Sequence, residues 1–165
     1  MKLLRFLKND RYPDCLKIKG RPKLPTSSFK EADRLYHAFD NEDLDEYENI
    51  KLETIRFPDF SCNWSRFSKL RHVRLRKNGK KTDGCYSFTV QVSRYKSFAT
   101  PVHDPISDRI FPNYSHVEVR ELFEGEDILY EPPKNRKKKS KKRKSIRMEY
   151  RQNLLNNKFI ELSPE

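Results

Sequence analysis

Two of the four histidines lie within residues 101–122, at positions 103 and 116. Two histidines can divide the work of phosphodiester cleavage, one neutral as a base and one protonated as an acid, because imidazole titrates near neutral pH. Arg120 would stabilise the charge that develops on the phosphate. RNA supplies its own 2′-hydroxyl nucleophile, so such an enzyme needs no metal. The pattern therefore makes a small ribonuclease or toxin-like enzyme one candidate function, with these catalytic residues: His103, Asn113, His116, Glu118 and Arg120.

Two other interpretations of the same stretch stay open. Both histidines would make structural hydrogen bonds in the first, with Asn113 supporting a turn. In the second, His103, Asp104, His116 and Glu118 would bind a metal, since imidazole and carboxylate are suitable ligands. Their spacing matches no established metal motif, and the chain has no GxxxxGK[ST] or GxGxxG loop. We therefore predict no metal and no cofactor.

The positions of these groups depend on local structure. Residues 116–120 alternate between polar and apolar, which is typical of a strand, where side chains repeat every two residues. His116, Glu118 and Arg120 would share one face, and the two valines between them would face the core. Pro105 and Pro112 bracket a loop that would return His103 toward the polar face. We expect Glu118 to orient His116 only through loop partners.

The net charge of +12 is concentrated in residues 134–147, which contain ten Lys and Arg and no acid. Such a run repels itself and is expected to be solvated and flexible unless a polyanion neutralises it. The run would bind nucleic acid with an affinity that depends on salt and is largely independent of nucleotide sequence. The predicted nucleic-acid-binding residues are Lys134, Arg136, Lys137, Lys138, Lys139, Lys141, Lys142, Arg143, Lys144 and Arg147.

The basic run has alternative interpretations as a solubilising linker, an address signal or a site for an acidic protein partner. A membrane is disfavoured, because residues 134–144 lack the apolar side chains of an interfacial helix. Residues 40–48 hold six acids. They would form either a solvated surface segment or an acidic segment that docks against the basic run when no polyanion is bound. Arg66, among Phe60, Trp64 and Phe67, fits a base-stacking surface, although we favour core packing for these aromatics.

Composition supports a packed protein in a reducing cytoplasm. Only 35% of residues are hydrophobic, but 11 Phe, 8 Tyr and 1 Trp supply a core. No apolar run approaches the length of a membrane span. Three cysteines without a CxxC pair disfavour a disulfide framework or a zinc site.

The predicted fold class is α+β, a mostly antiparallel sheet with a helix near each end and a basic, flexible segment. One helix would begin near Ser28 and end near Asp40, and a closing helix would present Ile146, Tyr150 and Leu154. Strands are expected at residues 50–60, 72–76, 86–92 (half-buried), 116–120 and 128–130, and residues 159–162 would either add a terminal strand or simply pack on the core. The domain boundaries would be an irregular segment 1–25, a core 26–133, the basic segment 134–147, and a helix and strand 148–165 that pack on the core.

Three blocks of the chain resemble a family of small uncharacterised bacterial proteins. Arg21, Pro22, Ser28 and Phe29 resemble its Arg-Pro-x-Ser-Ser-x-Phe block, with extra residues inserted. Ser61, Asn63 and Arg66 resemble its Ser-Val-Asn/Asp-Arg block, in which Trp64 departs from the usual Arg. His103, Pro105, Asn113 and His116 resemble its His-x-Pro…Asn-x-x-His block most closely. The resemblance covers residues 20–120 and implies a domain and candidate positions, but no activity.

The sequence favours a cytoplasmic protein that binds nucleic acid, either RNA or DNA, through its basic segment. The ribonuclease is the first alternative. A subunit of a larger protein or nucleoprotein assembly is the second.

Overall fold

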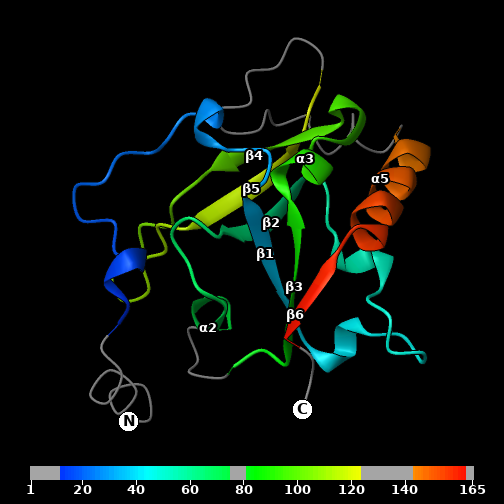
Figure 1. The fold of residues 1–165 in the computed structure, drawn as a ribbon, viewed down its shortest axis with the longest axis horizontal. Helices are drawn as coiled ribbons and strands as arrows, with labels where there is room; N and C mark the ends of the chain where they lie inside the picture. Colours follow the sequence, from blue (N-terminus) through cyan, green and yellow to red (C-terminus); the bar gives the residue numbers. More distant parts are fainter. Residues whose placement is uncertain (1–11, 75–80, 124–142, 163–165) are drawn as a thin grey trace.

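A computed structural model describes residues 12–74, 81–123 and 143–162 of the chain (Figure 1). A six-stranded antiparallel sheet in the order β4-β5-β2-β1-β3-β6 organises this part. The strands are β1 (Arg34–Phe39), β2 (Asp59–Trp64), β3 (Gly84–Thr89), β4 (Ala99–His103), β5 (His116–Glu121) and β6 (Phe159–Leu162). The α-helices are α2 (Leu70–Val73), α3 (Val90–Ser93) and α5 (Lys144–Asn156). Five 3-10 turns complete it: η1 (Asp14–Leu16), η2 (Thr26–Ser28), η3 (Asn41–Asp43), η4 (Leu52–Thr54) and η5 (Tyr95–Ser97).

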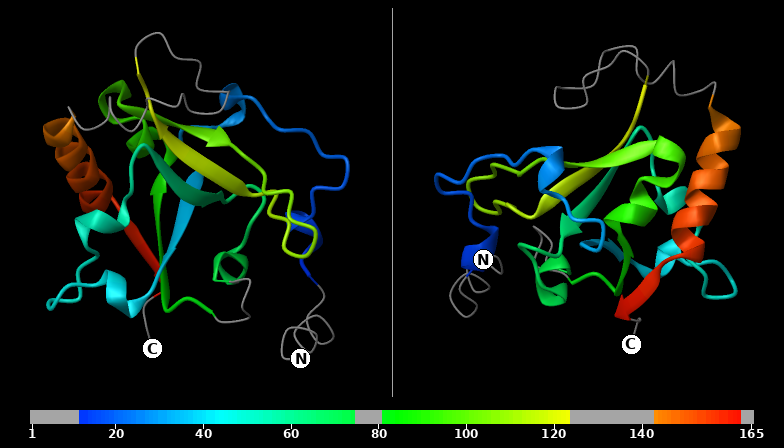
Figure 2. Two further views of the ribbon diagram at one scale, coloured as in Figure 1. Left: turned by 180° about the vertical axis from the view of Figure 1, so that it is seen from behind. Right: turned by 45° about the horizontal axis from the view of Figure 1, so that its top comes forward.

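One face of the sheet carries the hydrophobic core. Alternate residues of the central strands point into it, and the largest of them, Trp64, is fully buried beside the stacked ring of Phe29. Helix α5 packs on this core face through Tyr150, whose ring contacts Phe57 and Phe98. Figure 2 shows α5 alongside the sheet, at the opposite end of the molecule from segment 12–25. The expected α+β fold with an antiparallel sheet is therefore confirmed.

Several local predictions are confirmed at both ends of the core. Residues 116–120 form most of β5, and Val117 and Val119 are fully buried as expected. The closing helix is α5, in which Tyr150 and Leu154 are fully buried, and the terminal strand is β6.

The predicted helix from Ser28 to Asp40 is wrong, because this stretch contains strand β1 at the centre of the sheet. The apolar spacing fitted a helix, but Leu35 and Phe39 also satisfy a two-residue period and are both buried. Strand β1 is paired along its whole length with β3. Gly84 stands opposite Phe39, and an added Cβ would lie 2.2 Å from the Phe39 ring, so a larger residue there would displace this buried ring. Among the described residues, the long helix is therefore at the C-terminal end only.

Three other segment predictions need correction. Residues 72–74 belong to α2 and the turn after it rather than to a strand, and His72 Nδ1 accepts a hydrogen bond from the Lys69 amide (3.2 Å). The strand expected over residues 50–60 is replaced by η4 and then β2, because Thr54 closes a turn by donating to the Lys51 carbonyl (2.8 Å).

The strand expected over residues 86–92 ends at Thr89, whose hydroxyl accepts from the Val92 amide and begins α3. Strand β3 is buried on both faces rather than half-buried: Tyr86 and Phe88 lie in the core, and Cys85 and Ser87 on the other face are also fully buried. The strand expected at residues 128–130 lies outside the described residues.

No helix in the described part of the chain is long and apolar enough to cross a membrane.

Candidate functional site

The strand register gathers a group of polar side chains on the sheet face opposite the core. Asn63 and Ser61 of β2 stand beside His116 and Glu118 of β5, and Asp59 stands beside Arg120. Partners in an antiparallel pair point to the same side. These side chains, with Asp104 after β4, make up what we call the polar face: Asp59, Ser61, Asn63, Asp104, His116, Glu118 and Arg120.

His116 is held by hydrogen bonds to both ring nitrogens. Its Nδ1 donates to the Asp104 carbonyl oxygen (2.7 Å), and its Nε2 lies 3.1 Å from Glu118 Oε1. Burial by itself would lower the pKa of His116, but the hydrogen bonds to Glu118 and the Asp104 carbonyl outweigh it, so the pKa is raised above 6.5. The imidazole is therefore favoured in its protonated form beside the carboxylate.

Glu118 contacts His116 directly, so the prediction that it acts only through loop partners is wrong. Residues i and i+2 of a strand lie side by side on one face, and these side chains are long enough to meet. Ser61 Oγ donates to the same Glu118 oxygen (2.8 Å). The carboxylate thus bridges β2 and β5.

Arg120 lies between two carboxylates. Its guanidinium is 3.1 Å from Asp104 Oδ2 and 3.5 Å from Asp59 Oδ1, and Lys23 also pairs with Asp104 (2.8 Å). Burial would raise the pKa of Asp104, but the hydrogen bond from Lys23 and the charges of Lys23 and Arg120 lower it overall. The charges of the polar face are therefore largely neutralised by one another, which leaves Arg120 poorly suited to attract a phosphate.

Asn113 organises the turn that leads into β5. Its amide nitrogen donates to Asn63 Oδ1 (2.8 Å), and its amide oxygen accepts from the Ser115 amide and hydroxyl (3.1 and 2.7 Å). These contacts are those of a structural residue that joins the loop to β2.

His103 lies on the other side of the sheet. It stands opposite Val117 in the register and is fully buried among the rings of Trp64, Phe67 and Tyr114. Its Nε2 donates to the Tyr114 carbonyl (2.6 Å), and its Nδ1 accepts from the Leu24 amide (3.0 Å). Burial lowers the pKa of His103.

The structure therefore brings together His116, Glu118, Arg120 and Asn113 but separates them from His103. A substrate on the polar face would lie across the sheet from the His103 imidazole, whose two nitrogens are already bonded to backbone groups. The two-histidine division of acid and base is not assembled by this geometry.

The basic segment enters the described part of the chain only at Arg143, Lys144 and Arg147. Two of them are bound to the protein: Arg147 donates through Nε (3.1 Å) and NH2 (2.5 Å) to Glu121 Oε2, and Arg143 NH1 lies 3.3 Å from Glu121 Oε1. The Glu121 side chain is fully buried. Lys144 is exposed. The other predicted nucleic-acid-binding residues lie outside the described residues: Lys134, Arg136, Lys137, Lys138, Lys139, Lys141 and Lys142.

Sequence reasoning missed Glu121, although a signal for it was present. The alternation that sends Val117 and Val119 to the core sends Glu121 there too. A buried carboxylate needs a cation, and Arg143 and Arg147 recur at helical spacing on the closing helix. Together these patterns would have indicated an ion pair that fixes the start of α5.

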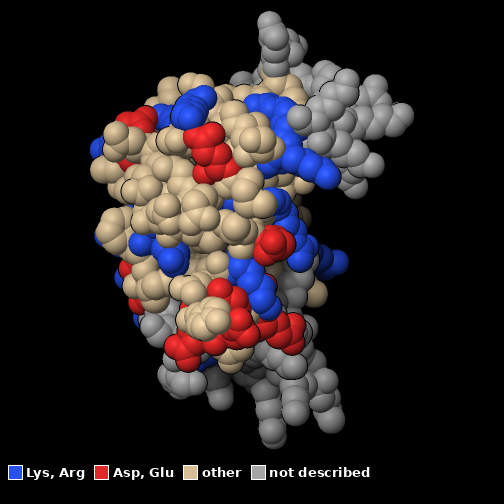
Figure 3. Space-filling model, turned by 90° about the vertical axis from the view of Figure 1, so that its right-hand side faces the viewer, with Lys and Arg blue, Asp and Glu red and all other residues tan. Residues whose placement is uncertain are grey.

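The acidic segment is partly used in its own turns. Asp45 Oδ1 accepts from the amides of Tyr47 and Asn49 (2.9 and 2.8 Å), and Asp43 Oδ2 accepts from the Asp40 amide (2.9 Å). Figure 3 shows acidic side chains gathered at the lower end of the α5 side, whereas Figure 1 places the start of α5 at the upper end. Docking of this segment on the basic run stays a prediction.

The aromatics around Arg66 belong mainly to the core, since Phe60 and Trp64 are buried. The Arg66 guanidinium lies 5.5 Å from the Trp64 ring and 5.3 Å from the Phe67 ring. In the described ranges, no group of three or more His, Cys, Asp or Glu side chains is arranged to hold a metal ion.

Comparison of the chain with protein-family models, with curated proteins and with solved structures found no match. The resemblance of residues 20–120 to a bacterial family stays a prediction.

Proposed function

We propose that this protein binds nucleic acid through the phosphate backbone, using the basic segment as its main electrostatic contact. The observation that carries the proposal is the concentration of ten Lys and Arg, without an acid, in residues 134–147. Each phosphate that such a segment neutralises releases counterions, so affinity falls steeply as salt rises.

The contacts of α5 refine which residues face the ligand. Arg143 and Arg147 are bound to Glu121, so the proposed phosphate contacts are the remaining eight: Lys134, Arg136, Lys137, Lys138, Lys139, Lys141, Lys142 and Lys144.

The structure also supports a fixed attachment for this segment. Arg143 NH1 donates to the Leu122 carbonyl (2.6 Å), next to Glu121 at the end of β5. The chain therefore leaves the sheet and returns to α5 at the same place. A ligand held by the segment would be held next to this end of the sheet.

The test is a titration of RNA, single-stranded DNA and duplex DNA with the full-length protein over a series of salt concentrations. One variant replaces Lys137, Lys138, Lys139 and Lys141 by Gln. The matched control replaces four exposed lysines of the body, Lys30, Lys51, Lys69 and Lys81, and so removes the same charge.

On duplex DNA, each phosphate contact contributes about 0.9 to the slope of log affinity against log salt. We therefore expect the loss of four lysines in the segment variant to reduce the magnitude of this slope by about 3 to 4. The control should keep most of the slope. Equal slopes in both variants would show that only net charge matters and would refute a dedicated segment.

The same samples on denaturing gels test the ribonuclease alternative. Shortened strands with the wild type, but not with His116→Ala, would identify a nuclease centred on the polar face. Intact, retarded strands in both proteins would support binding without cleavage. If the strands are neither retarded nor shortened, the proposal is refuted and a protein assembly is favoured.

A further inference from the structure

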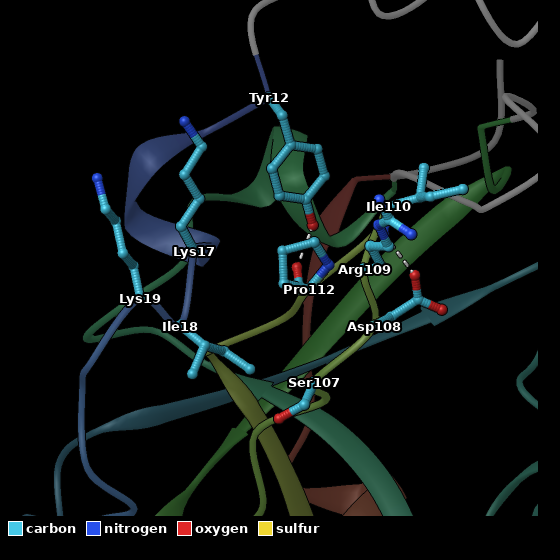
Figure 4. A pocket seen from close by; sticks show the side chains of 9 residues that line it. All are labelled: Tyr12, Lys17, Ile18, Lys19, Ser107, Asp108, Arg109, Ile110 and Pro112. Carbon is cyan, nitrogen blue, oxygen red and sulfur yellow. Dashed lines mark hydrogen bonds between the residues drawn. The ribbon is translucent and has the colours of Figure 1, made fainter.

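An open surface pocket of about 420 Å³ lies between two segments that are far apart in the sequence. Residues 12–19 form one wall and residues 107–112 form the other (Figure 4). The volume falls in the range of small-molecule sites. We call this surface pocket the Tyr12 pocket. It lies away from α5 and contains none of the residues of the polar face.

The two walls are joined to each other. Tyr12 donates a hydrogen bond from its hydroxyl to the Pro112 carbonyl, and the Tyr114 amide donates to the Leu16 carbonyl (2.9 Å). Burial, with the nearby Asp108 charge, raises the pKa of Tyr12 to about 12, so the hydroxyl keeps its proton at neutral pH. The pocket is therefore already formed, which lowers the entropy cost of binding.

The loop that carries Arg109 is also fixed. Asp108 Oδ1 accepts from the amides of Ile110 and Phe111 (2.8 and 2.9 Å). At the base of the loop, Ile106 and Asn113 exchange two backbone hydrogen bonds (3.1 and 2.9 Å). Arg109 and Ile110 are thus presented by an ordered turn.

The lining combines apolar surface with three cations and one carboxylate, Asp108, whose Oδ1 is already bonded to two backbone amides. Tyr12, Ile18 and Ile110 supply the apolar part, and Ile110 is 51% exposed. Lys17 and Lys19 extend from one wall and Arg109 lies on the other, with the Tyr12 ring between them in the view of Figure 4. Lys17 pairs with Asp14 (2.6 Å), so Lys19 and Arg109 are the principal cations for a ligand.

We propose that the Tyr12 pocket binds a nucleoside phosphate, either free or as one unit of a nucleic-acid strand. A base would cover the apolar surface of Tyr12 and Ile110, and its phosphate would be held at the rim of the pocket by the cations on either side of the Tyr12 ring, Arg109 and Lys19. Bases stack on aromatic side chains with little dependence on sequence, and Arg pairs with phosphate through two donors. The site goes beyond the proposed function, because it uses none of the basic segment.

The test is calorimetric titration of the full-length protein with adenosine and uridine monophosphates, inorganic phosphate, a tetranucleotide of RNA and a short polyglutamate peptide. The pocket variant is Lys19→Gln with Arg109→Gln. Its matched control is Lys30→Gln with Lys81→Gln, two exposed lysines outside the pocket. Near-ultraviolet circular dichroism would confirm that both variants remain folded.

We expect saturable binding of a monophosphate that is at least tenfold weaker in the pocket variant and within twofold of wild type in the control. Inorganic phosphate and polyglutamate should bind at least tenfold more weakly than the monophosphate, since they lack a base. A tetranucleotide that binds more tightly than the monophosphate, and loses that advantage in the pocket variant, would identify a strand as the source. A monophosphate that binds more tightly would identify the free nucleotide.

Absence of saturable binding would overturn the inference, as would equal losses in the two variants or equal affinity for phosphate, polyglutamate and nucleotide. The protein with residues 137, 138, 139 and 141 replaced by Gln should still bind the monophosphate. That result separates failure of this pocket from failure of the basic segment.

Discussion

The two faces of strand β5 use ionisable residues in opposite ways. On the core face, Glu121 is fully buried and pairs with two arginines of α5. On the polar face, His116 and Glu118 pair with each other and keep 11% and 16% of their side-chain surface exposed. The odd spacing of three residues between Glu118 and Glu121 thus separates a charge that keeps contact with solvent from a charge that holds a helix in place.

The two histidines show the same contrast. His103 is enclosed by aromatic rings and favoured as neutral, whereas His116 lies beside a carboxylate and is favoured as charged. A two-histidine motif in sequence therefore need not form one site. The face on which each imidazole lies decides what it can do.

The sharpest test of this contrast is removal of the buried charge. We expect Glu121→Gln to cost about 3–5 kcal/mol of unfolding free energy, because it leaves two arginines without their carboxylate. Urea denaturation measures this cost. Glu31→Gln, which breaks an exposed pair with Arg94, should cost less than about 1 kcal/mol. Equal costs would show that Glu121 contributes no more than a surface ion pair.

A second and smaller effect should separate the two histidines. His103→Ala would leave a cavity and remove the partners of two backbone groups, at a cost of about 2–4 kcal/mol. His116→Ala should cost less, about 1 kcal/mol, because 11% of this side chain is exposed and Glu118 keeps its hydrogen bond from Ser61. The measurement is urea unfolding at pH 7. A greater loss for His116→Ala than for His103→Ala would reverse our assignment of the structural histidine.

The smallest expected effect is a difference in pH dependence. The folded-state pKa of His116 is raised, so its contribution is fully present below the unfolded value of 6.5 and is lost as pH rises through the folded-state pKa. The stability of wild type minus that of His116→Gln should therefore fall with rising pH.

His103 has a lowered folded-state pKa, so its contribution has the opposite sign. The stability of wild type minus that of His103→Gln should increase as pH rises toward 6.5. Unfolding curves from pH 5.5 to pH 8 measure both trends. Two differences with the same slope would contradict the assigned environments.

Much of the polar face could be predicted from the sequence, because it depends on a single local pattern. The alternation of residues 116–120 correctly placed His116, Glu118 and Arg120 on one face. The partners of these residues could not be predicted, since Asp59 and Ser61 reach them only through pairing of β2 with β5. The Tyr12 pocket was missed for the same reason, as its walls lie about ninety residues apart.

What the sequence by itself determined is the antiparallel α+β character, strand β5 and the amphipathic closing helix, since each depends on the period of apolar residues along one element. Only the tertiary structure decided that residues 34–39 form a strand and that His103 faces the core. Both outcomes depend on hydrogen bonds to distant strands, which set the register and therefore the direction of each side chain. The local pattern of apolar residues determines the period with which the side chains of a segment recur. Long-range strand pairing determines which of those side chains come into contact.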